Sequence, residues 1–595
     1  MGRIKMEIYA VKIKGLLNPL GYDTKQAVLS WKVRGAQGKK QYSAAILVSL
    51  EPDMKETLWK KEGDLNSLGE TLDFVQQPYT RYYIQITVRS DANEEAKSAV
   101  CFFETGKLEE PWQARWIGVQ ADDTHPEFQK RFSLNGAVRA ARLYICGLGL
   151  FEASLNGTKC GNDQLAPFIN DYQEHYQYCV YDVTNQLCDE NTLSVLLGDG
   201  WYRGHYGLGS PTHYEKPLAL IAELRIRYAN GETDLICTDG SWQYRRSFTM
   251  LSDIYIGETQ DYFHWQKEAW KPAALIEAPG ALCARYSPPL HDMERIPVKE
   301  IIHTPAGETV LDMGQNFAGH VVCSQMIPAG TVMTWEFGET LQNGNFYHDN
   351  YRSAASKFTY VSDGAQREIR PRFTFFGFRY VKVSGLSSIE MDQFEGVALY
   401  SEMEQTGFME TGNNKINRLF LNSLWGLKSN FLDMPTDCPQ RDERLGWTGD
   451  AVVFSTTAGF HMDTRAFYQK FLQDLRTDQL RNHGKTAIFL PNMNPGLCAG
   501  VWSDAAAFLP NMLYDYYGDA EALRTHYPLM RDWVDAVFQM DKARGQKNLY
   551  DFGFQFGDWL ALDGSTEQST FGRTDMEHPA QSFRLAAVPA RAGQG

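Results

Sequence analysis

The hydrophobic pattern of this chain changes once, near residue 411, and that change limits the folds open to it. Before it, apolar residues alternate with polar ones, as at Leu224, Ile226 and Tyr228, and turn signals recur often. After it, apolar residues recur at helical spacing, and the first such run is Ile416, Leu419, Phe420, Leu424, Leu427 and Phe431. We therefore expect a β-rich N-terminal part followed by an all-helical part.

The β-rich part divides into three predicted units of the sandwich type. They cover residues 1–106, 107–290 and 291–405. An Asn-Gly pair between two alternating runs is a strong hairpin signal. This part of the chain has three such pairs: Asn156-Gly157, Asn230-Gly231 and Asn343-Gly344.

The helical part is predicted to span residues 406–575 and to hold about five helices, counted from the apolar periodicity. Its long loops, at 434–448 and 484–500, are of a kind that is often functional. Residues 576–595 form an atypical tail without this periodicity. A toroid of paired helices needs more helices than these to bury its inner faces. We therefore expect the helical domain to be incomplete in this chain, with apolar helix faces left unburied near 520–560.

Charge and targeting signals exclude several classes of partner. The formal net charge is −15, whereas nucleic acid and anionic membranes need basic patches. The N-terminus lacks the apolar region of a signal peptide, and no run approaches the roughly 20 apolar residues of a membrane span. The ten cysteines include no C-x-x-C pair, which indicates neither a zinc site nor a disulfide framework. We expect a cytoplasmic protein that binds neither nucleic acid nor membrane, and we leave its oligomeric state open.

The segment DCPQRDERLGWTGD, residues 437–450, is the best candidate for a site, because the motifs of phosphate-binding loops, dinucleotide folds, zinc proteases and serine hydrolases are absent. Its proline and glycines predict a loop rather than a regular helix or strand. If the loop folds inward, the carboxylates of Asp437, Glu443 and Asp450 converge. Crowded like charges, and burial beside Trp447, would favour protonation of one of them. Such an acid can donate a proton to a leaving oxygen, while Arg441 keeps a neighbour ionised.

The alternative is that these residues form a solvated charge run that only stabilises a loop. The large aromatic residue and the two glycines beside the charges favour the site, because a solvated run rarely needs them.

This segment resembles the signature of the bacterial α-L-rhamnosidases of glycoside hydrolase family 78. Four other segments resemble family segments in the family order: PWQARWIG, GDGWYRGHYG, DMGQNFAGHV and FTFFGFRYVKV. The resemblance implies an immunoglobulin- or fibronectin-like first unit, a jelly-roll second unit, a concanavalin-like third unit and an (α/α)6 catalytic barrel. It also implies hydrolysis of terminal, non-reducing α-L-rhamnosides with inversion of configuration.

The resemblance also implies roles for individual residues. Glu443 matches the general acid of the family, and Asp437 and Asp450 match aspartates that bind rhamnose hydroxyls and tune that acid. Arg441 belongs to the same substrate-binding set, and Trp447 would pack against the sugar. Two later tryptophans, Trp502 and Trp559, resemble further pocket walls, and Asp504 and Asp558 beside them would reach the ligand. Without the resemblance, both tryptophans could equally be core residues.

The general base of the family lies on a later barrel segment that has no match here, so we expect the base to be absent from this chain. That absence would leave the chain inactive as a fragment. Two other functions stay open: a non-catalytic protein that binds rhamnose or another carbohydrate, and a different inverting glycosidase with the same barrel type. Rhamnose-containing glycosides or oligosaccharides are the expected partners. Carboxylates alone can perform this hydrolysis, so no cofactor and no metal site are expected, although bound calcium is left open.

Overall fold

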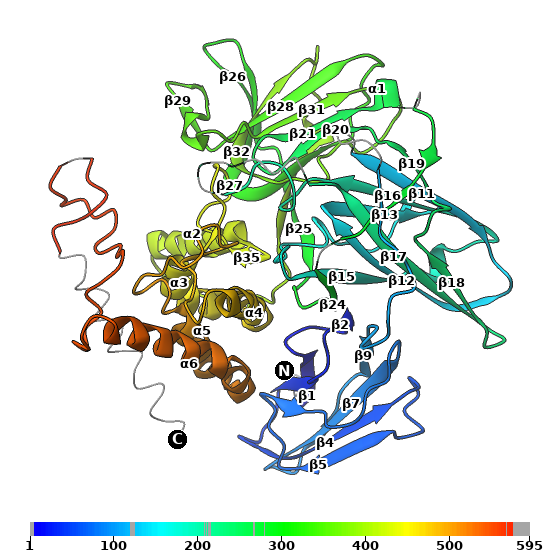
Figure 1. The fold of residues 1–595 in the computed structure, drawn as a ribbon, viewed down its shortest axis with the longest axis vertical. Coiled ribbons are helices and arrows are strands. Elements are labelled where there is room, and N and C mark those ends of the chain that lie inside the picture. Colours follow the sequence, from blue (N-terminus) through cyan, green and yellow to red (C-terminus); the bar gives the residue numbers. More distant parts are fainter. Residues whose placement is uncertain are drawn as a thin grey trace.

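The chain folds into three β-rich units followed by a group of helices, as the change of hydrophobic pattern predicts (Figure 1). In Figure 1 the first unit lies at the bottom, the second at the right, the third at the top and the helices at the left. This computed structural model describes residues 5–119, 125–207, 209, 211, 216–265, 268–278, 280–566 and 568–574. The predicted tail, 576–595, lies outside the described residues, and the predicted unit boundaries stay predictions.

The first unit contains two sheets. Their strands alternate between buried and solvent-facing residues, as expected for sheets with one face on a core. On β7, every second residue from Tyr82 to Val88 is buried. One sheet consists of β1 (Glu7–Ile13), β3 (Val28–Arg34) and β6 (Glu70–Thr71). The other has the order β2 (Leu20–Tyr22), β9 (Cys101–Thr105), β7 (Arg81–Ser90), β4 (Gln41–Ser49) and β5 (Trp59–Gly63), with β8 (Glu95–Lys97) paired to β7.

The second unit also contains two sheets, and two of the predicted hairpins lie in it. Asn230-Gly231 joins β17 to β18, and Asn156-Gly157 joins β13 to β14. The first sheet has the order β23 (Ala274–Leu275), β10 (Ile117–Gly118), β17 (Ala219–Tyr228), β12 (Val138–Leu148), β15 (His175–Asp182) and β24 (Ala281–Ala284), with β18 (Thr233–Cys237) paired to β17. The second has the order β14 (Thr158–Lys159), β13 (Leu150–Leu155), β16 (Glu190–Gly198), β11 (Pro126–Ser133), β19 (Gln243–Arg246) and β22 (Lys271–Pro272), and the short η1 (Thr184–Gln186) follows β15.

The third unit differs from a simple two-sheet sandwich, because its main strands form one nine-stranded sheet. Two of these strands, β20 and β21, come from the range predicted for the second unit, and β21 pairs in parallel with β31. The sheet has the order β20 (Thr249–Asp253), β21 (Gly257–Asp261), β31 (Lys357–Val361), β28 (Val332–Gly338), β32 (Phe376–Ser384), β27 (Thr309–Cys323), β33 (Phe394–Ser401) and β25 (Leu290–Pro297), with β26 (Glu300–His303) paired to β27. The third predicted hairpin joins β29 (Thr340–Gln342) to β30 (Asn345–Tyr347). Short helices are α1 (Tyr262–Trp265), η2 (Asp349–Tyr351) and η3 (Met391–Gln393).

The described helical region holds α2 (Asn414–Asn430), α3 (Thr448–His461), α4 (Arg465–Arg481), α5 (Ala505–Tyr517) and α6 (Ala520–Lys542). The side chain of Asp519 caps α6 by accepting from the amide of Ala522, and Gly518 ends α5 in the left-handed conformation, at φ +63°. Two short strand pairs lie between the helices: β34 (Phe431–Leu432) with β35 (Met434–Pro435), and β36 (Gly446–Trp447) with β37 (Phe489–Leu490). That the barrel is incomplete in this chain stays a prediction.

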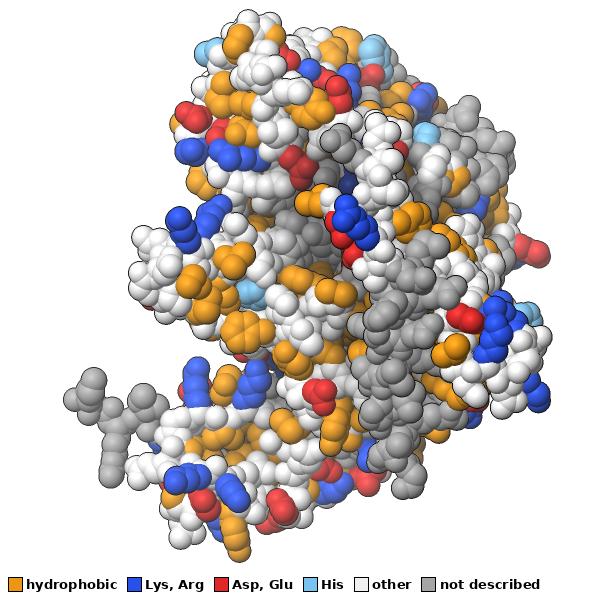
Figure 2. Space-filling model, turned by 90° about the vertical axis from the view of Figure 1, so that its left-hand side faces the viewer, with side chains coloured by type: hydrophobic (Ala, Val, Ile, Leu, Met, Phe, Trp, Pro, Cys, Tyr) orange, Lys and Arg blue, Asp and Glu red, His pale blue; other side chains and the backbone are white. Residues whose placement is uncertain are grey.

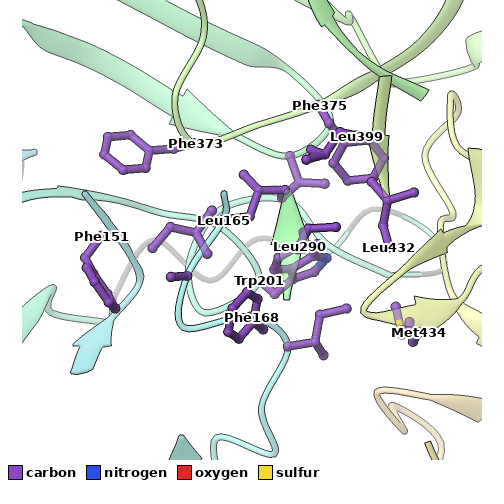
Figure 3. Packing of buried hydrophobic residues seen from close by; sticks show 14 of the residues in the cluster. Phe151, Leu165, Phe168, Trp201, Leu290, Phe373, Phe375, Leu399, Leu432 and Met434 are labelled. Carbon is purple, nitrogen blue, oxygen red and sulfur yellow. The ribbon is translucent and has the colours of Figure 1, made fainter. Parts of the chain in front are cut away.

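One continuous hydrophobic core joins the second unit, the third unit and the helices (Figure 3). Figure 3 shows Phe151 and Trp201 of the second unit, Phe375 of the third, and Leu432 and Met434 from the start of the helical region around the same volume. The first unit has a separate core of its own. The helical region is therefore built onto the β units beside it, with α2 packed against β27 and β33.

The face that carries the helices exposes several large apolar side chains. Figure 2 looks onto this side of the molecule, and hydrophobic side chains gather over its middle. Near the range in which unburied apolar faces were predicted, the exposed side chains are Tyr527, Phe538, Leu549, Phe554, Trp559, Leu560 and Leu562. Within the described residues, no helix has both the length and the apolar character needed to cross a bilayer.

Candidate active site

The segment 437–450 is a fixed loop, and the interpretation of a solvated charge run is wrong. Arg444 is 1% exposed and takes the left-handed conformation at φ +52°. Its guanidinium donates to the carbonyl oxygens of Ile254 at 3.0 Å, Phe375 at 2.9 Å and Gln440 at 2.9 Å. One buried arginine thus ties the loop to two other parts of the chain. The end of the segment is regular, because Trp447 lies in β36 and Thr448 begins α3.

Asp437 lies at the start of this loop with its side chain 8% exposed. One carboxylate oxygen accepts the amide of Leu445 at 3.0 Å, and the other accepts from the guanidinium of Arg441 at 3.2 Å. Burial, and then the negative charge of Glu443, raise the pKa of Asp437 to about 6. The sequence predicted that crowding would favour protonation of one carboxylate. In the structure, Asp437 has a pKa raised by burial and by the neighbouring charge of Glu443.

Glu443 is held by three donors, two from its own loop and one from the third unit. Its Oε2 accepts from Arg441 Nε at 3.1 Å and from Arg352 Nη2 at 3.0 Å. Its Oε1 accepts from Trp447 Nε1 at 3.1 Å. The sequence predicted that burial beside Trp447 would favour protonation of one of the carboxylates and that Trp447 would pack against a sugar; in the structure its indole donates a hydrogen bond to Glu443. With its side chain 12% exposed, the carboxylate is fixed in position yet still reachable from solvent.

A pocket of about 530 Å³, within the usual range for a small-molecule site, opens beside Asp437, and Glu443 is not among the residues that line it. Four predicted site residues line it: Asp437, Asp450, Trp502 and Trp559. Asp450 lies in the first turn of α3, and burial raises the pKa of its carboxyl. The rest of the lining mixes apolar groups, such as Phe431 and Phe454, with polar ones.

All three predicted tryptophans contact one residue, Phe556. Its ring stacks on Trp502 with centroids 4.0 Å apart, and it lies edge-on to Trp447 at 5.9 Å and to Trp559 at 5.4 Å. Trp502 can approach α3 closely because position 449 is glycine: a Cβ there would lie 2.6 Å from the indole. These rings form an aromatic wall whose flat faces suit the apolar face of a sugar.

The two remaining predicted aspartates differ in position. Asp504 is 4% exposed, and its carboxylate accepts from Trp533 Nε1 at 2.9 Å and from the amide of Val501 at 2.8 Å. We infer that Asp504 orders the turn that presents Trp502. Asp558 is half-buried and accepts from Thr574 Oγ1 at 3.4 Å, within the loop that carries Trp559.

Among the described residues, one group has a spacing that could hold a metal ion: Asp437, Cys438 and Glu443, with ligand atoms within 4.8 Å of one another. Its chemistry is unfavourable for a cation. Burial raises the pKa of the Cys438 thiol, and thiols bind metal as thiolates. The guanidinium of Arg441 already bonds to both carboxylates and would repel a cation.

Sequence reasoning missed the residues that hold this site from outside the segment. Arg352 and Ser353 come from the third unit: both contact Asp442, and Arg352 also contacts Glu443. Tyr255 donates to the backbone oxygen of Glu443 at 2.6 Å. No local pattern marks these residues, because their partners lie about 90 to 190 positions away in the chain.

The helical region follows three β units and carries a pocket lined by aspartates and tryptophans. This arrangement is typical of multidomain glycosidases. Four family models match the chain in order: the Rha78A-like N-terminal immunoglobulin domain at 8–109, the alpha-L-rhamnosidase N-terminal domain at 136–294, the concanavalin-like domain at 302–400 and the six-hairpin glycosidase domain at 404–588. The chain belongs to the bacterial α-L-rhamnosidase family.

Named relatives agree with this assignment. The chain is 30% identical to an alpha-L-rhamnosidase of Formosa agariphila over 96% of its own length and 66% of the relative. It is 32% identical to one of Alteromonas sp., covering 95% of this chain and 65% of the relative. The crystal structure of an Aspergillus terreus α-L-rhamnosidase superposes with a TM-score of 0.92 at 28% identity, covering 99% of this chain and 71% of that one. The chain thus spans slightly less than two thirds of the two curated relatives.

Proposed function

We propose that this chain carries the general acid and part of the sugar-binding pocket of an α-L-rhamnosidase. The complete site would hydrolyse terminal α-L-rhamnosides by single displacement. The observation that carries the proposal is the arrangement around Glu443, whose carboxylate lies among three donors beside Asp437 and the tryptophan-lined pocket. Family membership supports the substrate class. Rhamnose carries an apolar methyl group, which suits a pocket wall made of Trp502 and Trp559.

Glu443 is proposed to protonate the glycosidic oxygen as its bond to the anomeric carbon breaks. Asp437 and Glu443 are close neighbours, because an oxygen of each lies within 4.8 Å of the other and both carboxylates share the Arg441 guanidinium. Burial and the negative charge of Glu443 raise the pKa of Asp437 to about 6, so Asp437 retains a proton up to about that pH. We propose that this proton is on Glu443 when the leaving oxygen arrives, which leaves Asp437 to accept a hydrogen bond from a sugar hydroxyl.

Inversion needs a second carboxylate, roughly 6.5–9.5 Å from the acid, to take a proton from the attacking water. Asp437 is too close to Glu443 to fill that role. The sequence-based expectation that this base is absent from the chain stays a prediction. If it holds, the chain binds rhamnosides without turnover, which is the second candidate function.

Substituting Glu443 tests the acid role in a form of the protein that turns over rhamnosides. We expect Glu443→Gln to lower kcat/KM on alkyl rhamnosides by about 100- to 10,000-fold, the usual contribution of general acid catalysis. Aryl rhamnosides with good leaving groups need little protonation and should lose far less. Equal losses on both substrate types would remove Glu443 from the acid role.

Titration with L-rhamnose, alongside a hydrolysis assay on this chain, separates the two candidate functions. Binding without turnover supports the carbohydrate-binding function, and turnover of α-L-rhamnosides alone, within a panel of aryl glycosides, supports the rhamnosidase. The cytoplasmic location, the oligomeric state and the absence of nucleic-acid partners stay predictions from the sequence.

A further inference from the structure

A second polar pocket, of about 770 Å³, opens between the first and second β units. In Figure 1 this junction lies where β9 approaches β12 from below. None of the residues proposed for the rhamnoside site lines it. Its walls come from β7 and β9 of the first unit and from β12, β17 and β18 of the second.

The charge of this pocket is opposite to that of the whole chain. Five arginines line it: Arg81, Arg139, Arg142, Arg225 and Arg227. Three carboxylates line it: Glu51, Glu104 and Asp182. The lining therefore carries a net charge of +2, on a chain whose formal net charge is −15.

The positive charges of neighbouring arginines in this pocket repel one another. Arg142 on β12 lies directly opposite Arg225 on the neighbouring strand β17, and like charges at such positions destabilise a sheet. The carboxylate of Glu104 offsets the positive charge of Arg142, because it accepts from Arg142 Nε at 2.6 Å and from Nη2 at 3.0 Å. It also accepts from Arg81 at 2.7 Å. One buried carboxylate is thus shared by two guanidinium groups.

Arg225 and Arg227 have no comparable partner. In the part of the chain that the structure describes, no carboxylate oxygen lies within 4.0 Å of either guanidinium group. Arg225 instead lies over the ring of Tyr79, 4.5 Å from its centroid, and Arg227 is exposed. Two positive charges on one face of β17 therefore remain available to an anion.

The floor of the pocket holds an unused donor. Tyr144 is 1% exposed, and within the described residues its hydroxyl has no hydrogen-bond partner. Burial, together with the negative charge of Glu104, raises the pKa of this phenol, so the hydroxyl keeps its proton. A buried donor without a partner is rare in folded proteins and indicates a group that a ligand or water satisfies.

We propose that this pocket binds an anionic saccharide, with a carboxylate or sulfate group held by Arg225 and Arg227. Guanidinium groups bind planar oxyanions through paired hydrogen bonds. The volume exceeds that of a bare oxyanion and falls within the range of pockets for larger ligands. Binding of the anion stands on the pocket alone, whereas the saccharide that carries it rests on the proposed function.

Calorimetric titration of the whole chain tests the proposal with three probes: a tri-uronate oligosaccharide, its carboxyl-reduced neutral analogue and sodium sulfate. We expect the tri-uronate to bind, the neutral analogue not to bind, and the affinity to fall as NaCl rises. The double variant Arg225→Ala/Arg227→Ala should weaken tri-uronate binding at least tenfold. Arg89→Ala, an exposed arginine of the first unit paired with Glu95, is the matched control and should leave binding unchanged.

Several outcomes would overturn the site. Equal binding of the acidic and neutral trimers, or an unchanged double variant, would remove the anion recognition. Sulfate bound as tightly as the tri-uronate would make this a site for an adventitious ion only. Thermal unfolding of each variant shows whether a loss of binding follows a loss of folding. A chain that binds the tri-uronate but neither binds nor hydrolyses rhamnosides would contradict the proposed function and leave this site intact.

Discussion

At the scale of single residues, Arg352 links a β unit to the proposed acid. Its Nη2 lies 3.0 Å from Glu443 Oε2, its Nε pairs with Asp442, and its backbone has a positive φ of +60° with a ψ of −116°. A residue without glycine's freedom rarely adopts that conformation, so the surrounding contacts must hold it there. The geometry makes Arg352 a positioning residue for Glu443.

Replacing Arg352 should impair chemistry more than binding. We expect Arg352→Ala to lower kcat about 10- to 100-fold, because small displacements of a catalytic group have effects of that size, with little change in KM. Arg352→Lys keeps the charge but not the fork of donors and should recover part of the loss. Arg295→Ala removes an arginine of equal exposure, 48%, whose partner is Glu395, and should have no effect on kcat. A rise in KM with kcat unchanged would contradict the positioning role.

The raised pKa of Asp437 predicts how stability depends on pH. At Asp437 the folded protein retains a proton that the unfolded chain releases between about pH 4 and pH 6, so the contribution of Asp437 to the free energy of unfolding should fall as pH rises through that range. The fall is expected to reach about 2–3 kcal/mol, since one pKa unit corresponds to about 1.4 kcal/mol. Urea unfolding at several pH values measures it. Asp437→Asn should remove this slope, whereas Glu95→Gln, at an exposed ion pair, should preserve it.

At the scale of single elements, helix α3 and the turn before α5 form one wall of the pocket together. Their contact depends on Gly449, because a Cβ at this position would lie 2.6–2.7 Å from the Trp502 indole. Trp502 in turn stacks on Phe556, which contacts the other two tryptophans. One added methyl group should therefore disturb the whole aromatic wall.

Two glycine-to-alanine substitutions test this contact. Gly449→Ala should destabilise the protein by about 1–3 kcal/mol through overpacking and weaken L-rhamnose binding, measured by tryptophan fluorescence. Gly240→Ala, in a turn of the second unit away from this pocket, places its methyl group in open space and should change stability by less than about 1 kcal/mol and leave L-rhamnose binding unchanged. Unchanged fluorescence and binding in Gly449→Ala would show that Trp502 does not form the wall.

At the scale of the whole molecule, the cores divide the chain into two parts. The second unit, the third unit and the helices share one core, and the first unit has its own. The first unit is attached to the helical region by Lys12, whose ammonium group lies 2.6 Å from Asp463 and 2.9 Å from Glu404. Buried ion pairs fix the geometry of such a contact but contribute little net stability.

Scanning calorimetry should therefore resolve two transitions, one for the first unit and one for the remainder. Limited proteolysis between them is expected to release the first unit while residues beyond about 111 stay folded. A single transition whose calorimetric and van't Hoff enthalpies agree for the whole chain would contradict this division.

The sequence alone determined which kind of element forms where. Apolar periods of two and of 3.6 residues distinguished the β units from the helices, and β33 ends at Ser401 while α2 begins at Asn414, on either side of the predicted change. The three Asn-Gly pairs lie at three hairpins because a tight turn needs residues that accept positive φ. The proposed acid, its neighbouring aspartates and the tryptophans came from one local segment and two short matches.

Only the tertiary structure decided how these residues act together. Arg352, Tyr255 and Phe556 reach the site across long stretches of chain, and a periodic pattern carries no information about such partners. The carbonyl oxygens that hold Arg444, and the burial that raises the pKa of Asp437, exist only after the second unit, the third unit and the helices share a core. The physical reason is that periodicity reports local backbone geometry, whereas desolvation and charge pairing depend on every group that surrounds a side chain in space.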